Sequence, residues 1–288
     1  MLNYGDAELG PDKVSWAVPA WFAALLLVCY APVLLSLARQ WETDQDMGHG
    51  FFVPILAGFI AWQKRGELLA QAPRPNWWGL GLVVLAGAQL YLATLGAEFF
   101  LARMAFVFSV IGIVLFLGGT GYVKTLAFPM MLLFFMIPIP AIIYNRITFP
   151  LQILASRAAE GTLLLLQIPV LREGNILELA EQRLSVVEAC SGIRSLLSLS
   201  FLALVYGYFF ESYKWIRVVL VLATIPIAIL ANASRVSLTG FLTEYQPELA
   251  EGFFHSASGW VIFMSALVML IVFHQIVKRS YGLLHARG

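Results

Sequence analysis

The sequence predicts an all-α polytopic membrane protein. Of its 288 residues, 60% are hydrophobic and only 12% are charged, whereas soluble domains average about 45–50% apolar and about 25% charged residues. Apolar runs of about 20 residues, the length that crosses the hydrocarbon core as a helix, recur along the chain. A net charge of +1 without a long basic block argues against a nucleic-acid partner.

Eight apolar segments are candidates for membrane-spanning helices. They are Ala17–Leu37, Phe51–Trp62, Trp77–Leu95, Phe99–Leu117, Val123–Ile143, Ile193–Phe210, Ile216–Ala231 and Ala257–Val277. The second is short, so its flanks must snorkel or the bilayer must thin around it. Because no internal repeat, low-complexity tract or soluble domain interrupts the series, we expect a single domain over residues 1–288 without a fused C-terminal domain.

Basic residues in the short loops set the expected orientation. If eight helices alternate, one side collects Lys13, Lys64, Arg65, Arg74, Lys124, Lys214, Arg217, Lys278, Arg279 and Arg287. The short loops on the other side carry Glu42, Asp44, Asp46 and Glu98, with Arg39 and Arg103 only at their edges. The basic side is therefore expected to be cytoplasmic, with both termini on it.

The long stretch between the fifth and sixth spans then lies outside the cytoplasm. Its first part, Arg146 to Gln167, is amphipathic and is expected to lie in the membrane interface or to dip partly into it. In its second part, Gly174-Asn175 marks a turn, and Ile176–Leu179 is expected to pair with Arg183–Val187 as a short β-hairpin. This hairpin would deliver the next residues to the top of the sixth helix.

Cys190 lies at that junction, where the polar, strand-like run becomes a long apolar helix. A thiol in the first turn of a helix is close to the positive end of the helix dipole and to unpaired backbone N–H groups, which favour the thiolate. The same N–H groups could receive an oxyanion. The alternative is that Cys190 is a small buried apolar residue. A disulfide with Cys29 is not expected, because Cys29 falls inside an apolar span.

Three further polar residues are predicted at outer helix ends, at a depth similar to that of Cys190. Asn232 and Arg235 lie at or just past the end of the seventh span, and His255 precedes the eighth by about half a turn. A histidine beside a cysteine activates the thiol, and an arginine supplies charge for an oxyanion. Each residue also has a simpler explanation, because Arg235 could snorkel to the headgroups and His255 could stand near a helix N-cap.

Other polar residues are weaker candidates for the same site. Glu188 could be an ordinary acidic residue before a helix, and Arg194 could snorkel outward. His49 lies between two glycines at the entry to the second span, which suggests either a close-packed site or an ordinary loop histidine. Four histidines without HExxH or CxxC spacing give no metal motif, so we expect neither a metal nor another cofactor.

Several of these segments together resemble the signature blocks of the exosortase/archaeosortase family. The blocks are Glu188-Ala189-Cys190-Ser191-Gly192-Ile193-Arg194, Asn232-Ala233-Ser234-Arg235 and His255-Ser256-Ala257-Ser258-Gly259-Trp260, and His49-Gly50-Phe51-Phe52-Val53-Pro54 after Trp41 is similar to the amino-proximal block. They occur in the family's order and span most of the chain, from about Trp41 to Trp260.

The resemblance implies a multi-pass enzyme of the bacterial inner membrane with a periplasmic active site. Family members recognise proteins ending in a Pro-Glu-Pro motif, a transmembrane helix and a basic tail, cut near the motif, and pass the product onward for surface display alongside exopolysaccharide. The family's catalytic cysteine, arginine and histidine map to Cys190, Arg235 and His255. Supporting or substrate-binding roles are then expected for His49, Glu188, Ser191, Gly192, Arg194 and Asn232.

Two other function classes stay open. A transporter or lipid flippase would need polar residues through the membrane midplane, and the third, fourth and eighth spans offer almost none. A non-catalytic scaffold for polysaccharide export would leave a thiol, a guanidinium and an imidazole at one depth unexplained. Within the enzyme reading, Ser191 is a lesser option as nucleophile, and the acceptor of the acyl group could be water, an amine or a lipid-linked molecule.

Overall fold

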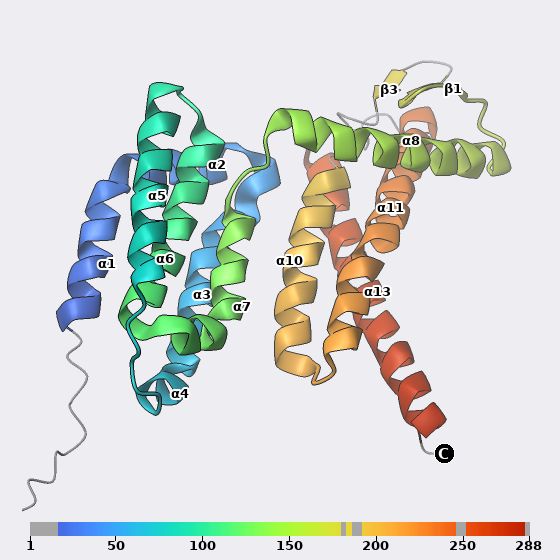
Figure 1. The fold of residues 1–288 in the computed structure, drawn as a ribbon. Coiled ribbons are helices and arrows are strands. Elements are labelled where there is room, and N and C mark those ends of the chain that lie inside the picture. The colour runs from blue at the N-terminus through green and yellow to red at the C-terminus, as the bar shows by residue number, and fades with distance from the viewer. Residues whose placement is uncertain (1–16, 180–182, 186–191, 246–251, 286–288) are drawn as a thin grey trace, which may run out of the picture. The chain divides into compact units, whose positions relative to one another are not determined.

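The computed structural model describes residues 17–179, 183–185, 192–245 and 252–285 (Figure 1). Its contacts divide the chain into two compact units, residues 1–44 with 48–138 and residues 45–47 with 139–288. Helices build both units, and the described strands form one small sheet in the second. We describe each unit by itself.

The first unit contains most of the N-terminal half of the chain. Its helices are α1 (Ala17–Cys29), α2 (Ala31–Thr43), α3 (Phe52–Gln63), α4 (Arg65–Leu69), α5 (Trp77–Leu95), α6 (Phe99–Thr125), α7 (Ala127–Leu132) and η2 (Leu133–Met136). The short helix η1 (Gln45–Phe51) belongs to it from Gly48 onward. The first predicted span is a broken helix, because α1 and α2 are bent by 69°. At the break, the buried Tyr30 hydroxyl lies 2.8 Å from the Ser109 hydroxyl of α6.

The helices α5 and α6 form a tight antiparallel pair (Figure 1). Each begins with a side-chain cap: the Asn76 side chain accepts a hydrogen bond from the Trp78 amide, and the Glu98 carboxylate accepts one from the Leu101 amide. A Cβ atom on Gly112 would lie only 3.0 Å from the Gly79 carbonyl oxygen. Small residues thus allow the two backbones to approach closely, as is common between membrane helices.

The fifth predicted span, Val123–Ile143, is not one helix. The α6 helix extends through a non-helical Gly119 (φ 77°) to Thr125, and the short α7 and η2 follow. Pro138 and Pro140 then separate η2 from the next helix, since proline lacks the amide donor and restricts the residue before it. An apolar run of the right length therefore contains several elements, because the helix breaks fall inside it.

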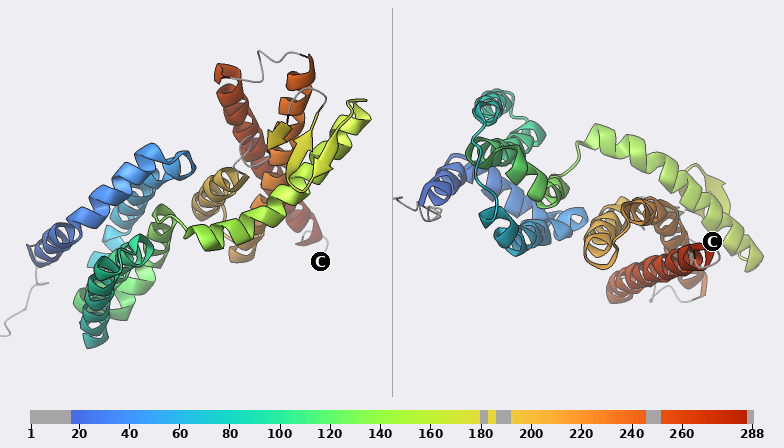
Figure 2. Two further views of the ribbon diagram at one scale, coloured as in Figure 1. Left: turned by 90° about the horizontal axis from the view of Figure 1, so that it is seen from above. Right: turned by 60° about the horizontal axis from the view of Figure 1, so that its bottom comes forward.

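Among its described residues, the second unit contains four helices and the sheet. The helices are α8 (Ala141–Leu165), α10 (Gly192–Phe210), α11 (Lys214–Tyr245) and α13 (Gly252–His285). Fully buried apolar side chains hold α10, α11 and α13 together, namely Leu199, Ala203, Ile216, Leu220, Ala266 and Leu270. The α8 helix lies across one end of this group (Figure 1; Figure 2).

The α8 helix confirms that the predicted amphipathic segment is helical. One face packs against the unit through residues such as Ser156 and Ala159, both fully buried. Another face exposes large apolar side chains, including Ile147, Leu154 and Leu165. A helix with a protein-facing side and an exposed apolar side is suited to the membrane interface.

The sheet has three antiparallel strands in the order β1 (Leu171–Glu173), β2 (Ile176–Glu178) and β3 (Arg183–Ser185). The predicted hairpin is confirmed in β2 and β3, where Leu177 pairs with Leu184. The predicted turn at Gly174 is present with φ 65° but connects β2 to the additional strand β1. The strand β1 was missed because a three-residue strand is too short to show alternation.

The described helices support a multi-pass membrane protein. Four of them are long and apolar enough to cross a membrane, or up to six if two bent helix pairs each count as one span, and two shorter apolar helices accompany them. The predicted third span matches α5 residue for residue, and the sixth matches α10 within one residue. The total of eight spans stays a prediction.

Candidate active site

Two of the predicted site residues, Asn232 and Arg235, lie on α11. The prediction that they stand at or past the end of a helix was wrong, because α11 continues ten residues beyond Arg235 to Tyr245. The polar residues end the apolar run but not the helix. The hydroxyl groups of Ser237 and Thr243, for example, each donate a 2.9 Å hydrogen bond to a carbonyl oxygen one turn earlier in α11. Asn232 is buried and Arg235 is partly buried.

The Arg235 side chain lies against α13 at Gly259. The position that a Cβ atom of Gly259 would occupy is 3.2 Å from the Arg235 Nη2 atom and 3.3 Å from its Cζ atom. Gly259 comes four residues, about one helical turn, after His255. The prediction that His255 precedes its helix was also wrong, because α13 begins at Gly252 and His255 is in its first turn. The structure describes only the backbone of His255.

Cys190 lies outside the described residues, but the segments on both sides of it belong to the second unit. On one side, the sheet packs on α11 and α8 through a cluster that contains Leu163, Leu177 and Val236, with Leu184 of β3 against it. A Cβ atom on Gly240 of α11 would lie 3.5 Å from the Leu184 Cδ1 atom. On the other side, α10 begins at Gly192. The strand that precedes Cys190 is therefore held against the helix that carries Arg235.

The remaining candidates around Cys190 are described incompletely. Glu188 and Ser191 lie outside the described residues. Gly192 and Arg194 are in the first turn of α10, where the structure describes the backbone alone. Among the described residues, no group of three or more histidine, cysteine, aspartate or glutamate side chains could hold a metal ion.

His49 belongs to the first unit and is not an exposed loop residue. Its side chain is 8% exposed, and its Nε2 atom lies 3.2 Å from the Phe135 carbonyl oxygen. Beside it, the Trp41 indole donates a hydrogen bond of 2.9 Å to the next carbonyl, that of Met136. Two side chains thus satisfy carbonyl groups where η2 ends, which gives His49 a role in holding this turn in place.

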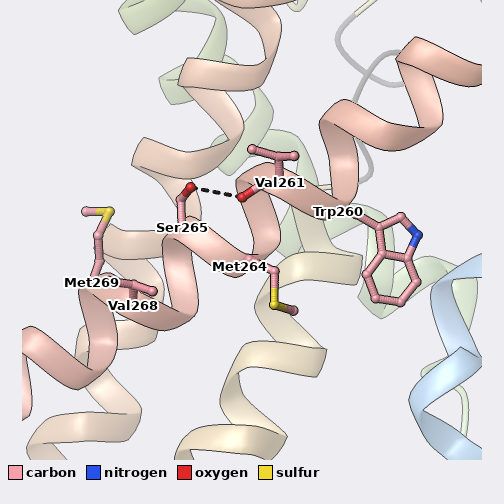
Figure 3. Close-up of a pocket in the computed structure, with 6 residues that line it drawn as sticks. All are labelled: Trp260, Val261, Met264, Ser265, Val268 and Met269. Atoms are coloured by element: carbon pink, nitrogen blue, oxygen red, sulfur yellow. Dashed lines mark hydrogen bonds between the residues drawn. The ribbon is translucent and has the colours of Figure 1, made fainter.

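An open apolar hollow lies on α13 directly after Gly259 (Figure 3). It is lined by Trp260, Val261, Met264, Ser265, Val268 and Met269. The only hydroxyl among them, on Ser265, donates to the Val261 carbonyl within the helix at 2.9 Å. Because its lining is mostly apolar, the hollow is suited to contact with apolar chains.

Sequence reasoning missed a buried polar network at the other end of the second unit. The His274 Nε2 atom of α13 lies 2.9 Å from a Glu211 carboxylate oxygen, and the Tyr206 hydroxyl of α10 lies 2.9 Å from His274 Nδ1. The Glu211 and His274 side chains are 1% and 2% exposed. The only sign of this network in the sequence is Glu211 itself, a single glutamate after an apolar run. Its partner His274 is 63 residues away and could not be identified from the sequence.

Burial would raise the pKa of Glu211, but other contacts outweigh it and leave the pKa below its ordinary value. These contacts are hydrogen bonds from His274 and from the Tyr213 and Ser212 amides, together with the charge of Lys278. The Arg217 guanidinium donates two hydrogen bonds, 2.8 and 2.6 Å long, to the Glu211 carbonyl oxygen. The network therefore links the end of α10, the start of α11 and α13.

The comparisons with known proteins give one match. The model of a family described as Transmembrane exosortase (Exosortase_EpsH) matches residues 41–272. This range includes α11, the first part of α13 and all of the candidate site residues. No curated protein and no solved structure matches the chain.

Proposed function

Because the chain belongs to the transmembrane exosortase family, we propose that it is a membrane cysteine transpeptidase or protease that processes membrane-anchored proteins carrying a C-terminal sorting signal. The signal is a Pro-Glu-Pro motif followed by a transmembrane helix and a basic tail. Processing occurs at the periplasmic face of the inner membrane and serves surface display linked to exopolysaccharide.

The proposed reaction proceeds through a thioester on Cys190. The thiolate attacks the scissile carbonyl carbon, and the tetrahedral intermediate collapses by breaking the C–N bond. His255 accepts the thiol proton and gives it to the departing amine, and it then takes a proton from the acceptor, water or an amine, that cleaves the thioester. Arg235 stabilises the oxyanion or orients the substrate, with backbone N–H groups near Ser191 and Gly192 contributing.

The observation that supports this proposal most is the position of Arg235. Its guanidinium lies against α13 one turn from His255, and the strand leading to Cys190 packs on the same helix as Arg235. A permanent positive charge beside a residue that can exchange protons is what the reaction needs. A scaffold without chemistry would not require this arrangement.

The decisive experiment is to replace Cys190 and follow processing of a co-expressed substrate that bears the sorting signal. Cys190→Ala and Cys190→Ser should both abolish cleavage, because a serine here would lack the base assistance its higher pKa demands. Cys29→Ala is the matched control, since Cys29 is an exposed cysteine at the end of α1 and should be nearly silent.

A labelled substrate should also be trapped as a thioester on wild-type protein and not on Cys190→Ala. Identification of the released product would show whether water or an amine takes the acyl group. If Cys190→Ala, present in the membrane at wild-type level, still cleaved the substrate, the cysteine mechanism would be wrong and the scaffold or transporter classes would return.

A further inference from the structure

The contact between Gly259 and Arg235 is closer than ordinary packing. The Cβ position of Gly259 lies 3.2 Å from Nη2, 3.3 Å from Cζ and 3.5 Å from Nη1 of Arg235. Favourable contacts between carbon atoms are about 3.5–4.0 Å long. An alanine methyl group at residue 259 would therefore push the guanidinium away by a few tenths of an ångström.

The three distances also give the orientation of the guanidinium. If its N–H edge pointed at residue 259, the two nitrogen atoms would both be clearly closer than Cζ. Instead all three atoms are almost equally distant, so the planar face of the group rests on the α13 backbone. The N–H donors then point parallel to that surface, which suits a planar fork that binds an oxyanion beside α13.

Gly259 differs from Gly282, a glycine further along the same helix. Gly282, also in α13, has nothing within 4 Å of its Cβ position. Glycine is the poorest helix former after proline, so a glycine inside a helix calls for a packing or functional reason. At Gly259 the close guanidinium supplies that reason.

We propose that Gly259 is a positioning residue, whose missing side chain lets the Arg235 guanidinium lie flat on α13 and so fixes the distance between the guanidinium and the turn of α13 that carries His255. This inference rests on the proposed function, because the distance matters only if the two side chains act on one substrate. Catalytic groups must be held within about 0.5 Å of their working geometry, and a misplacement of about 1 Å can cost about 100-fold in rate. A shift of a few tenths of an ångström should therefore be measurable.

The first readout is the rate of substrate processing. Gly259→Ala should lower kcat by about tenfold or more with little change in KM, because Arg235 would still be present but displaced at the transition state. Gly282→Ala is the control in the same helix and should process within about twofold of the wild-type rate. A Gly259→Ala protein that processed at the wild-type rate would overturn the inference.

The second readout is thermal unfolding of the protein in detergent, which does not depend on activity. Alanine is the better helix former, so Gly282→Ala should raise the unfolding midpoint by the same amount with Arg235 or with Arg235→Ala. Gly259→Ala should raise it only in the Arg235→Ala protein, where the guanidinium is gone, and should leave it unchanged or lower it otherwise. Equal gains from Gly259→Ala in both proteins would overturn the contact itself.

The two readouts distinguish failure of this inference from failure of the proposed function. If Cys190→Ala processed substrate as fast as wild type, the function would be wrong, whatever the unfolding midpoints showed. If Cys190→Ala were inactive but Gly259→Ala fully active, the function would stand and the positioning role would be rejected.

Discussion

The proposed mechanism requires different properties of Arg235 and His255. Arg235 must hold a permanent charge in a fixed plane, whereas His255 must gain and lose a proton. A lysine keeps the charge of Arg235 but not its planar fork. Arg235 rests its flat face on Gly259, and the buried Asn232 lies about one turn away on α11. We therefore expect Arg235→Lys to lose about 100-fold or more in cleavage rate, the typical cost of removing one oxyanion donor.

The test scores substrate capture and cleavage separately for Arg235→Lys. Capture should persist, because the positive charge is retained. If Arg235→Lys cleaved at close to the wild-type rate, charge alone would suffice, and the planar contact with Gly259 would have no catalytic consequence.

His255→Gln separates a proton-transfer role from a structural one. Glutamine keeps similar size and one hydrogen bond but cannot titrate, so turnover should fall by about 100-fold to 10,000-fold while capture is largely kept. His255→Ala should be no worse. A His255→Gln protein with near wild-type turnover would mean that His255 is structural and that Cys190 has another base. His49 is then the remaining candidate, although its Nε2 atom faces the Phe135 carbonyl.

Residue chemistry predicted which side chains to consider, but not what surrounds them. The prediction that Cys190, Arg235 and His255 act together came from residue types, helix parity and the family resemblance. Gly259 was seen only as part of a motif, because a close approach between residues 24 positions apart in sequence is not visible in composition. The hydrogen bonds of His49 and Trp41 to two successive carbonyl groups of η2 could not be predicted from the sequence either.

At the scale of elements, the Glu211 network joins three helices through one histidine. An ionised carboxylate can only accept hydrogen bonds, so His274 Nε2 donates to Glu211, and Nδ1 shares a hydrogen bond with the Tyr206 hydroxyl. The second carboxylate oxygen accepts from the Tyr213 amide at 2.8 Å. Every polar group of the His274 ring thus has a partner, which a buried network needs to be stabilising.

We expect Glu211→Gln to lower the free energy of unfolding by about 1–3 kcal/mol at neutral pH. A glutamine has one accepting oxygen and a nitrogen that only donates, so either His274 or the Tyr213 amide loses its acceptor. Tyr206→Phe should cost about 1 kcal/mol, one hydrogen bond. Glu67→Gln is the control, since Glu67 is 56% exposed and pairs with Lys64 at the surface, where such pairs contribute little. Denaturant unfolding in detergent measures all three.

The same network predicts a direction for the pH dependence of stability. The pKa of Glu211 is lower in the folded protein than its ordinary value of 4.5, so the folded state favours the charged form. Its stabilisation is fully present above pH about 4.5 and is lost as the pH falls through the lower folded pKa. Glu211→Gln should remove this acid-dependent loss, and an unchanged acid profile would contradict the role of the Glu211 charge.

Helix existence was predicted better than helix ends. Apolar runs located α5 and α10, but α11 and α13 extend past the predicted boundaries into polar sequence. Ser237 and Thr243 bond back to carbonyl oxygens of their own helix, so polar residues continue α11 instead of ending it. Conversely, the apolar run Val123–Ile143 hides breaks, because hydropathy registers neither the end of α6 at Thr125 nor the two prolines after Ile137 as helix interruptions.

At the scale of the molecule, the basic residues at the short loops of each unit lie at one end of that unit. In the first unit, the Arg74 amide donates to the Gly118 carbonyl and the Gln71 side chain donates to Thr125, so the loops carrying Arg74 and Lys124 share an end. In the second unit, Arg217 and Lys278 surround Glu211, roughly 30 Å along α11 from Arg235 by helix rise. This grouping was predicted from the sequence, because successive helices alternate in direction and the basic residues fall in every second loop.

The charge asymmetry predicts that the candidate site faces the periplasm and the Glu211 end faces the cytoplasm. In a protein carrying Cys29→Ala, a membrane-impermeant thiol reagent should label Cys190 in intact cells. Two single cysteines placed in a cysteine-free protein calibrate the result. Leu171→Cys on β1 and Leu283→Cys on α13 replace side chains that are 59% and 65% exposed, at the site end and the Glu211 end of the second unit.

Leu171→Cys should label in intact cells, and Leu283→Cys only after lysis, because the sheet packs beside Val236 while Leu283 lies beyond His274 on α13. Poor labelling of Cys190 alone would not decide the orientation, since lipid could shield a thiol at the interface. The two reference cysteines remove that ambiguity. If Leu283→Cys labelled in intact cells and Leu171→Cys only after lysis, the orientation would be inverted, and the site could not act on substrates in the periplasm.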